Sequence, residues 1–301
     1  MMRKLGIDIG GTSIKYGIVE ELNVISNHEL VNNFNTTEDF TNKINSIIDS
    51  VLKTDEIKSV GIAFPGSIDK NGYIKSAPNL SYLEGYNLYE SLYNSDLNIN
   101  VENDAYLAAL AESKLNSLNE YYFVTLGTGI GSTVIRDGEL IKSKYGSSGE
   151  LGHMVLNFKD ATDNYRTGIF ENYFNNSQFV ERANHDLKNF PNSVLNGLDT
   201  FTAREISDSS KLGDDLSIIT IMEMGKILGI GFSSAANLTG IPIFVIGGGI
   251  SNLTSLLFDT ALKTMKERVI PELRNNIEIQ ISKNKNLAGI LGAALFTKEN
   301  N

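Results

Sequence analysis

Two glycine-rich segments contain the residues of this chain best suited to chemistry. They read IDIGGTSIKYGIV at 7–19 and VTLGTGIGSTVI at 124–135. In each, a short β-branched strand runs into a turn of small residues and a second apolar strand follows, which predicts a β-hairpin. A tip without bulky side chains lets backbone N–H groups approach an anion closely. A facing pair of such tips could hold a chain of phosphates, so the sequence predicts a nucleotide-binding enzyme.

Two common phosphate-binding motifs fit these segments poorly. A P-loop needs G-x-x-x-x-G-K-[ST] before a helix, whereas Gly10, Gly11 and Thr12 lead into residues typical of a strand. A Rossmann fingerprint needs glycines that open a helix, and that pattern is missing. Each cluster alone could be only a tight turn. Two matching copies, and a third cluster of glycines at 247–249 after the run IPIFVI, favour a functional interpretation.

Asp104 stands where a predicted strand ends and a strong helical pattern, AYLAALAESKL, begins. Catalytic groups of open α/β sheets often occupy this position. A carboxylate there could take the proton of a hydroxyl nucleophile. The same residue also fits an ordinary helix N-cap, and the residues alone do not separate the two interpretations.

Composition limits the possible partners. The chain has 301 residues, 41% of them hydrophobic, which predicts about two domains and, we expect, a cleft. A net charge of -10 argues against nucleic acid and anionic membranes and favours a small substrate. With no cysteines there can be no disulfide or thiolate ligand, and three histidines make a His-based zinc site a poor expectation. No long apolar run or signal-peptide core is evident, so we expect a cytoplasmic protein.

Apolar periodicity predicts two mixed α/β domains, at 1–117 and 118–286. The Ala-rich helix at 287–299 is expected to return to the first domain. Thr36 or Thr37 is the expected N-cap of the first helix. Strands are predicted at about 3–9, 13–19, 23–33, 57–64, 98–101, 241–246 and 277–281, and later helices at about 177–189, 200–210, 213–239 and 253–268.

Six blocks of residues resemble the ROK family (repressors, open reading frames, kinases), which includes bacterial sugar kinases. They are DIGGT with Lys15, FPG at 64–66, END at 102–104, GTGIG at 127–131, GELGHM at 149–154 and the late GGG. The resemblance implies an actin-like, hexokinase-like (ribonuclease H-like) two-domain α/β fold, with ATP in a cleft between mixed sheets and a hexose hydroxyl as acceptor. Family repressors carry an N-terminal helix-turn-helix. Because the first strand begins by residue 3, we expect no such domain here.

The chain departs from the family in one loop. Kinases of this family usually bind a structural zinc through the histidine matching His153 and a C-x-C-G-x-x-G-C-x-E stretch. Thr162, Asn164 and Ile169 stand where the cysteines would be, so no zinc is expected. Glu171 remains, and we expect the loop to point this carboxylate at the sugar, held by the packing of Phe170, Tyr173 and Phe174.

The resemblance assigns the acceptor side of the site. It makes Asp104 the expected catalytic base. Carboxylates accept from hydroxyls and a neutral imidazole can donate or accept, which suits the reading of sugar hydroxyls. His153 considered alone would be a satisfied core histidine, and Asn79 has a competing role in a turn. The expected substrate-binding residues are Gly66, Asn79, Asn103, Asp104, Glu150, His153 and Glu171.

The nucleotide side follows from the same blocks. Asp8 is expected to hold Mg²⁺, directly or through water, because this cation keeps waters and takes few carboxylates. Lys15 either supplies positive charge or is a solvated strand lysine. Ser132 replaces a glycine more usual in the second loop. The phosphates are expected against Gly10, Gly11, Thr12, Thr128, Gly129 and Gly131, and adenosine near Gly247, Gly248 and Gly249.

The expected activity is an ATP- and Mg²⁺-dependent transfer to the 6-hydroxyl of a hexose or N-acylhexosamine, with glucose and N-acetylmannosamine as leading acceptors. A fructose or β-glucoside kinase is the next alternative. A sensor that binds sugar without transfer is an alternative of another class. A homodimer is expected from the family. An acyl-phosphate acceptor would not need Glu150, His153 and Glu171.

Overall fold

The computed structural model describes residues 3–69, 71–77, 79–92, 97–116, 118–141, 148–282 and 287–297. The chain divides into two compact units. Unit 1 contains Met1–Asn119, Ile135–Ser148 and Asn284–Asn301, and unit 2 contains Glu120–Val134 and Gly149–Lys283. The expected boundaries differ from this division, because residues 135–148 group with unit 1 and not with the second domain.

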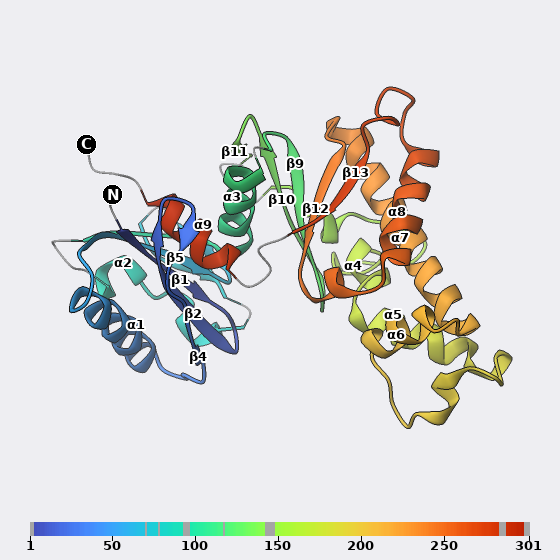
Figure 1. Cartoon of the computed structure of the whole chain (residues 1–301), viewed down its shortest axis with the longest axis horizontal. Coiled ribbons are helices and arrows are strands. Elements are labelled where there is room, and N and C mark those ends of the chain that lie inside the picture. Colours follow the sequence, from blue (N-terminus) through green and yellow to red (C-terminus); the bar gives the residue numbers. More distant parts are fainter. Residues whose placement is uncertain are drawn as a thin grey trace. The chain divides into compact units, whose positions relative to one another are not determined.

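Unit 1 is built on a mixed sheet (Figure 1). The strand order is β3-β2-β1-β5-β8, with β4 also paired to β2. Strand β1 runs antiparallel to β2 and parallel to β5, and β5 runs parallel to β8. The predicted strand at 23–33 is in fact two short strands. The strands are β1 (Arg3–Ile9), β2 (Ser13–Glu20), β3 (Asn23–Val24), β4 (His28–Val31), β5 (Ile57–Phe64) and β8 (Asn98–Asn103), with a small separate pair, β6 (Ser67–Ile68) and β7 (Ile74–Ser76).

Helix α9 (Ala288–Phe296) packs against the sheet of unit 1, where Figure 1 shows it in red among blue strands. A Cβ on Gly61 of β5 would lie 1.8 Å from the carbonyl oxygen of Ala293, so only glycine permits this approach. The other helices of unit 1 are α1 (Thr37–Leu52), which Thr36 caps, α2 (Leu88–Ser91), α3 (Asp104–Asn116) and the short η1 (Ser81–Leu83).

The second sheet repeats the plan of the first. Its order is β11-β10-β9-β12-β13, and β12 runs parallel to both β9 and β13. In both sheets the first strand of a glycine-turned hairpin therefore pairs with one parallel strand, and a second parallel strand follows beyond it. The strands are β9 (Tyr121–Leu126), β10 (Ile130–Arg136), β11 (Glu139–Leu140), β12 (Ile243–Gly247) and β13 (Glu278–Ile281).

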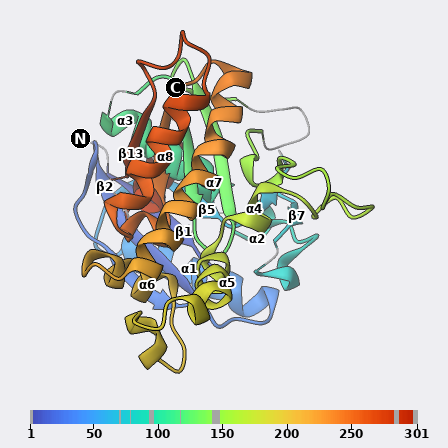
Figure 2. The same ribbon diagram turned by 90° about the vertical axis from the view of Figure 1, so that its right-hand side faces the viewer.

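Two long helices dominate unit 2, and Figure 2 shows them side by side. Helix α7 (Asp215–Thr239) is capped by Asp214 and packs on α8 (Ser255–Arg268). By length and composition α7 could cross a membrane, but 61% of its most apolar window is buried inside the protein, as in a core helix. The remaining helices are α4 (Phe170–Tyr173), α5 (Asn176–Asp186), α6 (Ala203–Lys211) and the short η2 (Leu151–His153), η3 (Leu187–Asn189), η4 (Val194–Gly197) and η5 (Gly249–Asn252).

Candidate functional site

Unit 1 gathers its acidic candidates at one edge of the sheet. The carboxyl ends of the parallel strands β1, β5 and β8 meet there, and Asp8 stands in register with Ala63, which is in register with Glu102. Asp104 begins α3 directly after β8. The sheet thus brings Asp8 close enough to Asp104 for its charge to raise the pKa of Asp104.

Asp104 does not serve as the cap of its helix. The side-chain oxygen of Asn103 accepts the N–H of Tyr106 at 3.1 Å, which is the capping bond. Asp104 Oδ1 accepts only the N–H of the next residue, Ala105, at 2.8 Å. Burial raises the pKa of Asp104 to about 6, the Ala105 N–H opposes the rise, and the charge of Asp8 adds to it. A carboxylate with this pKa accepts a proton more readily than an ordinary aspartate.

Asp8 is a buried carboxylate that suits a cation. Burial raises its pKa, and Lys15, its cross-strand partner on β2, partly offsets that rise. Its carboxylate lies against the backbone of α9, where a Cβ on Gly289 would fall 2.3 Å from Cγ of Asp8. No hydrogen-bond donor among the described residues reaches its oxygens. One carboxylate with open coordination positions fits Mg²⁺, which keeps several waters. Within the described ranges no group of three or more His, Cys, Asp or Glu residues could hold a metal ion.

The turn of the first hairpin is braced by Asn32, which sequence reasoning missed. The N–H of Gly10 donates to the carbonyl of Ser13 at 2.8 Å and closes the turn. Asn32 Nδ2 donates to the carbonyl of Gly10 at 2.7 Å, and the Asn32 N–H donates to the carbonyl of Thr12 at 2.9 Å. Asn32 is only 7% exposed. Nothing in the local sequence indicates this role, because it depends on β4 pairing with β2.

Of the sugar-side candidates in unit 1, Asn79 lies next to the same turn, whereas Gly66 and Asn103 contact each other. Asn79 is exposed, and a Cβ on Gly11 would lie 3.0 Å from the Asn79 Cβ. The carbonyl of Gly66 accepts from Asn103 Nδ2 at 3.1 Å. The amide of Asn103 therefore has structural partners on both its oxygen and its nitrogen. Unit 1 contains the candidates Asp8, Gly10, Gly11, Thr12, Lys15, Gly66, Asn79, Asn103 and Asp104.

The second hairpin turn lies in unit 2 together with Glu171. The N–H of Gly127 donates to the carbonyl of Gly129 at 3.1 Å, and Thr128 is exposed at the tip. Glu171 Oε2 accepts the N–H of Ile130 at 3.3 Å. A Cβ on Gly129 would lie 2.7 Å from that same oxygen. The carboxylate is thus held directly against the glycine turn.

Ser132 anchors the GELGHM segment to β10. Its hydroxyl donates to the carbonyl of Gly149 at 2.6 Å and accepts the N–H of Leu151 at 2.8 Å. These two bonds flank Glu150, whose side chain is exposed, as is that of His153. A glycine at 132 could make neither bond. The serine therefore has a structural explanation: it fixes the backbone that presents Glu150.

Hydrogen bonds hold the loop at 157–169. Thr162 Oγ1 and Thr167 Oγ1 lie 3.0 Å apart, and the Thr167 hydroxyl also donates to the carbonyl of Asn164 at 2.8 Å. The hydroxyl of Tyr173 donates to Asp160. Packing alone, which the sequence suggested, is thus an incomplete account, although Phe170 and Phe174 are fully buried. Hydrogen bonds therefore stabilise the part of the loop in which the family pattern has its cysteines.

The third glycine cluster follows β12 and lies against β9. Gly247 is in register with Thr125, and a Cβ on Gly248 would lie 2.4 Å from the carbonyl oxygen of Leu126. Gly248 also has a φ of 81°, which favours glycine. Unit 2 contains the remaining candidates: Thr128, Gly129, Gly131, Glu150, His153, Glu171, Gly247, Gly248 and Gly249.

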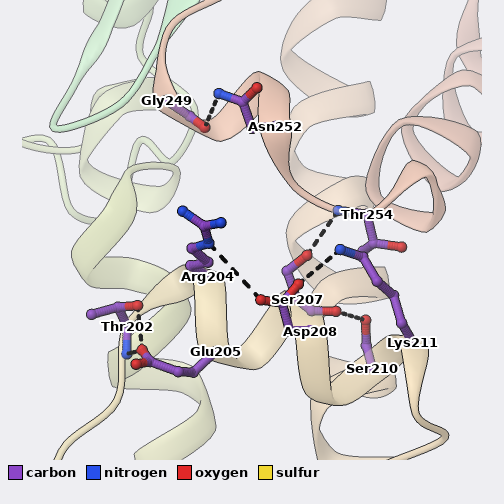
Figure 3. A network of polar contacts seen from close by, with 10 residues as sticks. All are labelled: Thr202, Arg204, Glu205, Ser207, Asp208, Ser210, Lys211, Gly249, Asn252 and Thr254. Atoms are coloured by element: carbon purple, nitrogen blue, oxygen red, sulfur yellow. Dashed lines mark hydrogen bonds and ion pairs between the residues drawn. The ribbon is translucent and has the colours of Figure 1, made fainter.

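Helix α6 is fastened beside this cluster, which the sequence did not indicate (Figure 3). The N–H of Thr254 donates to Ser207 Oγ at 2.8 Å in a buried bond. In Figure 3 the guanidinium of Arg204 extends from α6 on the side of Gly249 and Asn252. Arg204 Nε lies 3.9 Å from Asp208, too far for a hydrogen bond.

The chain is similar to several sugar kinases. It is 28% identical to the glucokinase of Thermotoga maritima over 99% of this chain and 98% of that protein. It is 26% identical to the N-acetyl-D-glucosamine kinase of Haemophilus influenzae, over 96% of this chain and 97% of that protein. A crystal structure of a ROK family glucokinase from Streptomyces griseus, in complex with glucose and AMPPNP, matches with a TM-score of 0.78 and 26% identity, over 98% of this chain and 99% of that chain.

The family model confirms the resemblance inferred from the motifs. Its match runs over residues 4–300 and carries the description ROK family. The expected fold class, the actin-like α/β fold of hexokinases, is confirmed by the related structures. The chain belongs to the ROK family.

Proposed function

We propose that this chain catalyses ATP-dependent phosphorylation of a hexose or N-acylhexosamine at its 6-hydroxyl. The observation that carries the proposal is the state of Asp104. It is a buried carboxylate whose pKa is raised to about 6. It does not cap its helix, because Asn103 makes the capping hydrogen bond. A merely structural aspartate at a helix start would cap the helix and have its charge stabilised there.

In the proposed reaction Asp104 takes the proton of the acceptor hydroxyl as the oxygen bonds to the γ-phosphorus and the bond to ADP breaks. General-base catalysis of this kind contributes about 10² to 10⁴ in rate. The remaining acceleration comes from positioning and charge neutralisation, as in other phosphoryl transfers. Glu150, His153 and Glu171 recognise acceptor hydroxyls, helped by Asn79, Asn103 and the backbone at Gly66.

The glycine turns serve the nucleotide. The turns at Gly10, Gly11 and Thr12, and at Thr128, Gly129 and Gly131, line the phosphates; the N–H of Gly10 closes its own turn, and other backbone N–H groups of the two tips bind the phosphate oxygens. Gly247, Gly248 and Gly249 lie near adenosine. Asp8 holds Mg²⁺, directly or through water, and this ion supplies charge neutralisation on the phosphates. Lys15 adds positive charge beside Asp8, as their cross-strand pairing supports.

Two alternatives remain to be separated by experiment. One is a kinase of the same family for fructose or a β-glucoside. The other is a sugar sensor without catalysis, because the family also contains repressors. The raised pKa of Asp104 favours the kinase, because a protein that only binds sugar does not need a carboxylate that accepts a proton.

The test is an ATP-coupled assay on glucose, mannose, fructose, N-acetylglucosamine and N-acetylmannosamine. We expect turnover of at least one aldohexose or N-acylhexosamine. Glu171→Gln should weaken the preference among acceptors and leave the KM for ATP nearly unchanged. Binding of sugar by calorimetry with no turnover on the panel would replace the kinase with the sensor.

A further inference from the structure

The loop at 157–169 presents two residues that no family role accounts for, Tyr165 and Arg166. Its two ends are held together, because the N–H groups of Leu156 and Asn157 both donate to the carbonyl of Gly168, at 2.8 and 3.1 Å. Inside the loop, the Arg166 N–H donates to Asn164 Oδ1 at 2.9 Å. The positions of Tyr165 and Arg166 are therefore fixed by hydrogen bonds on both sides, through Asn164 and Thr167.

Arg166 is placed beside the carboxylate of Glu171. Its Nη2 lies 3.6 Å from Glu171 Oε1, which is an ion pair beyond hydrogen-bond length. The other oxygen of Glu171 accepts from Ile130, so this carboxylate cannot swing away freely. The Arg166 side chain is 57% exposed. A guanidinium carries five donors in a planar fork, so it can bind another acceptor while it stays near Glu171.

Tyr165 gives the same place an aromatic surface. Its ring lies roughly parallel to the imidazole of His153, with centroids 6.5 Å apart and planes at 26°. The Arg166 guanidinium lies 5.9 Å from the centre of the Tyr165 ring. Tyr165 is 77% exposed. An exposed aromatic ring near His153 and Arg166 offers a flat apolar face next to donors.

We propose that Tyr165 and Arg166 form an acyl-binding part of the acceptor site, in which Arg166 donates to the carbonyl of an acylamino substituent and Tyr165 contacts its planar amide and methyl group. The inference rests on the proposed function, because it assumes that Glu171 and His153 bind the acceptor. A donor fork beside an apolar ring matches an amide better than it matches a hydroxyl.

The charges near this place favour a neutral carbonyl over an anionic substituent. Glu171 lies beside Arg166, Glu150 is exposed in the same unit, and the whole chain carries a net charge of -10. One guanidinium already close to a carboxylate attracts an additional anion weakly. An N-acylated amino sugar is therefore the acceptor class that the loop selects.

The decisive measurement is the ratio of kcat/KM for matched acceptor pairs: N-acetylmannosamine with mannose, and N-acetylglucosamine with glucose. For the wild-type protein we expect one acylated sugar to exceed its parent sugar by about 10-fold or more. Arg166→Gln should reduce this ratio by about 10-fold, and Tyr165→Ala should reduce it more than Tyr165→Phe. The KM for ATP should be unchanged in all three.

Lys159→Gln is the matched control. Lys159 is exposed on the same loop, and its side chain makes no ion pair or hydrogen bond within the described residues. The variant loses the same charge as Arg166→Gln and should retain the wild-type ratio. A wild-type protein that prefers both parent sugars, or an Arg166→Gln ratio equal to that of Lys159→Gln, would overturn the proposal.

Failure of the proposed function can be told apart from failure of this inference. If no sugar is phosphorylated, the kinase proposal falls, and dissociation constants from calorimetry for the same pairs take the place of the rate ratios. A preference for the acylated sugar that Arg166→Gln abolishes would still support the acyl-binding loop. Equal binding of acylated and parent sugars would refute it.

Discussion

Asn103 caps helix α3 and so leaves the neighbouring carboxylate of Asp104 without a capping task. The Asn103 oxygen accepts from Tyr106, and its amide nitrogen donates to Gly66. Two adjacent polar residues at the end of β8 thus have different roles. One fixes the backbone, and the other is a buried acid whose pKa is about 6.

Replacing Asp104 by asparagine should lower kcat by about 10² to 10⁴, because the amide cannot accept the proton. Binding of the acceptor, measured by calorimetry, should be nearly preserved. The wild-type kcat/KM should rise with pH up to about 6 and then level off, since the carboxylate must be ionised to act. Turnover of the variant near the wild-type rate would remove Asp104 from the role of base.

The same substitution should change how stability depends on pH. The folded-state pKa of Asp104 is raised to about 6, above the value in the unfolded chain. Its contribution is therefore most favourable below the unfolded pKa and is lost as pH rises through about 6. Between pH 4 and pH 8, the free energy of unfolding of Asp104→Asn should gain about 2 kcal/mol relative to wild type. Urea titrations of both proteins at the two pH values measure this difference. The prediction is contradicted if the difference in the free energy of unfolding between variant and wild type is the same at pH 4 and at pH 8.

Ser132→Ala should raise the KM for the acceptor several-fold and cost about 1 to 2 kcal/mol of stability, because it removes both bonds that flank Glu150. The KM for ATP should change little. Ser234→Ala is a suitable control, since the Ser234 hydroxyl donates only to a carbonyl of its own helix. Equal acceptor KM values in the two variants would show that Ser132 has no part in presenting Glu150.

Asn32→Ala should raise the KM for ATP, because the carbonyl of Gly10 loses its buried donor and the glycine turn loses its brace. We expect the KM for ATP to rise roughly 3- to 30-fold, which corresponds to the typical free-energy contribution of one buried hydrogen bond. Asn32→Asp should have a larger effect, since it places an acceptor against that carbonyl. The acceptor KM serves as the internal reference, and a matching rise there would point to general unfolding instead.

Elemental analysis of the purified protein should find no stoichiometric zinc. The loop at 157–169 is held by Thr162, Asn164 and Thr167, and the chain has no cysteine to serve as a ligand. A chelator should stop activity only by removing Mg²⁺, and added Mg²⁺ should restore it fully. About one zinc per chain, or activity that only zinc restores, would contradict this.

The sequence by itself determined the elements that depend on local pattern. The bounds of β5, a threonine cap at 36 or 37 and both glycine hairpins follow from apolar periodicity and turn residues within a few positions, and the structure puts the cap at Thr36. The family motifs are also local runs, and they identified the family that the family model confirms. Patterns of this kind can be recognised in the sequence without knowing which residues pack against them.

Only the tertiary structure decided which side chains support those candidates. Asn32 reaches Gly10 because β4 pairs with β2, Ser132 reaches Gly149 across 17 residues, and Glu171 reaches Ile130 across 41. The single strand expected at 23–33 is split for the same reason, since pairing with β2 decides which residues complete the ladder. Serine, asparagine and glutamate can bond to any backbone group brought near them, so their partners are fixed by chain packing and not by neighbouring residues.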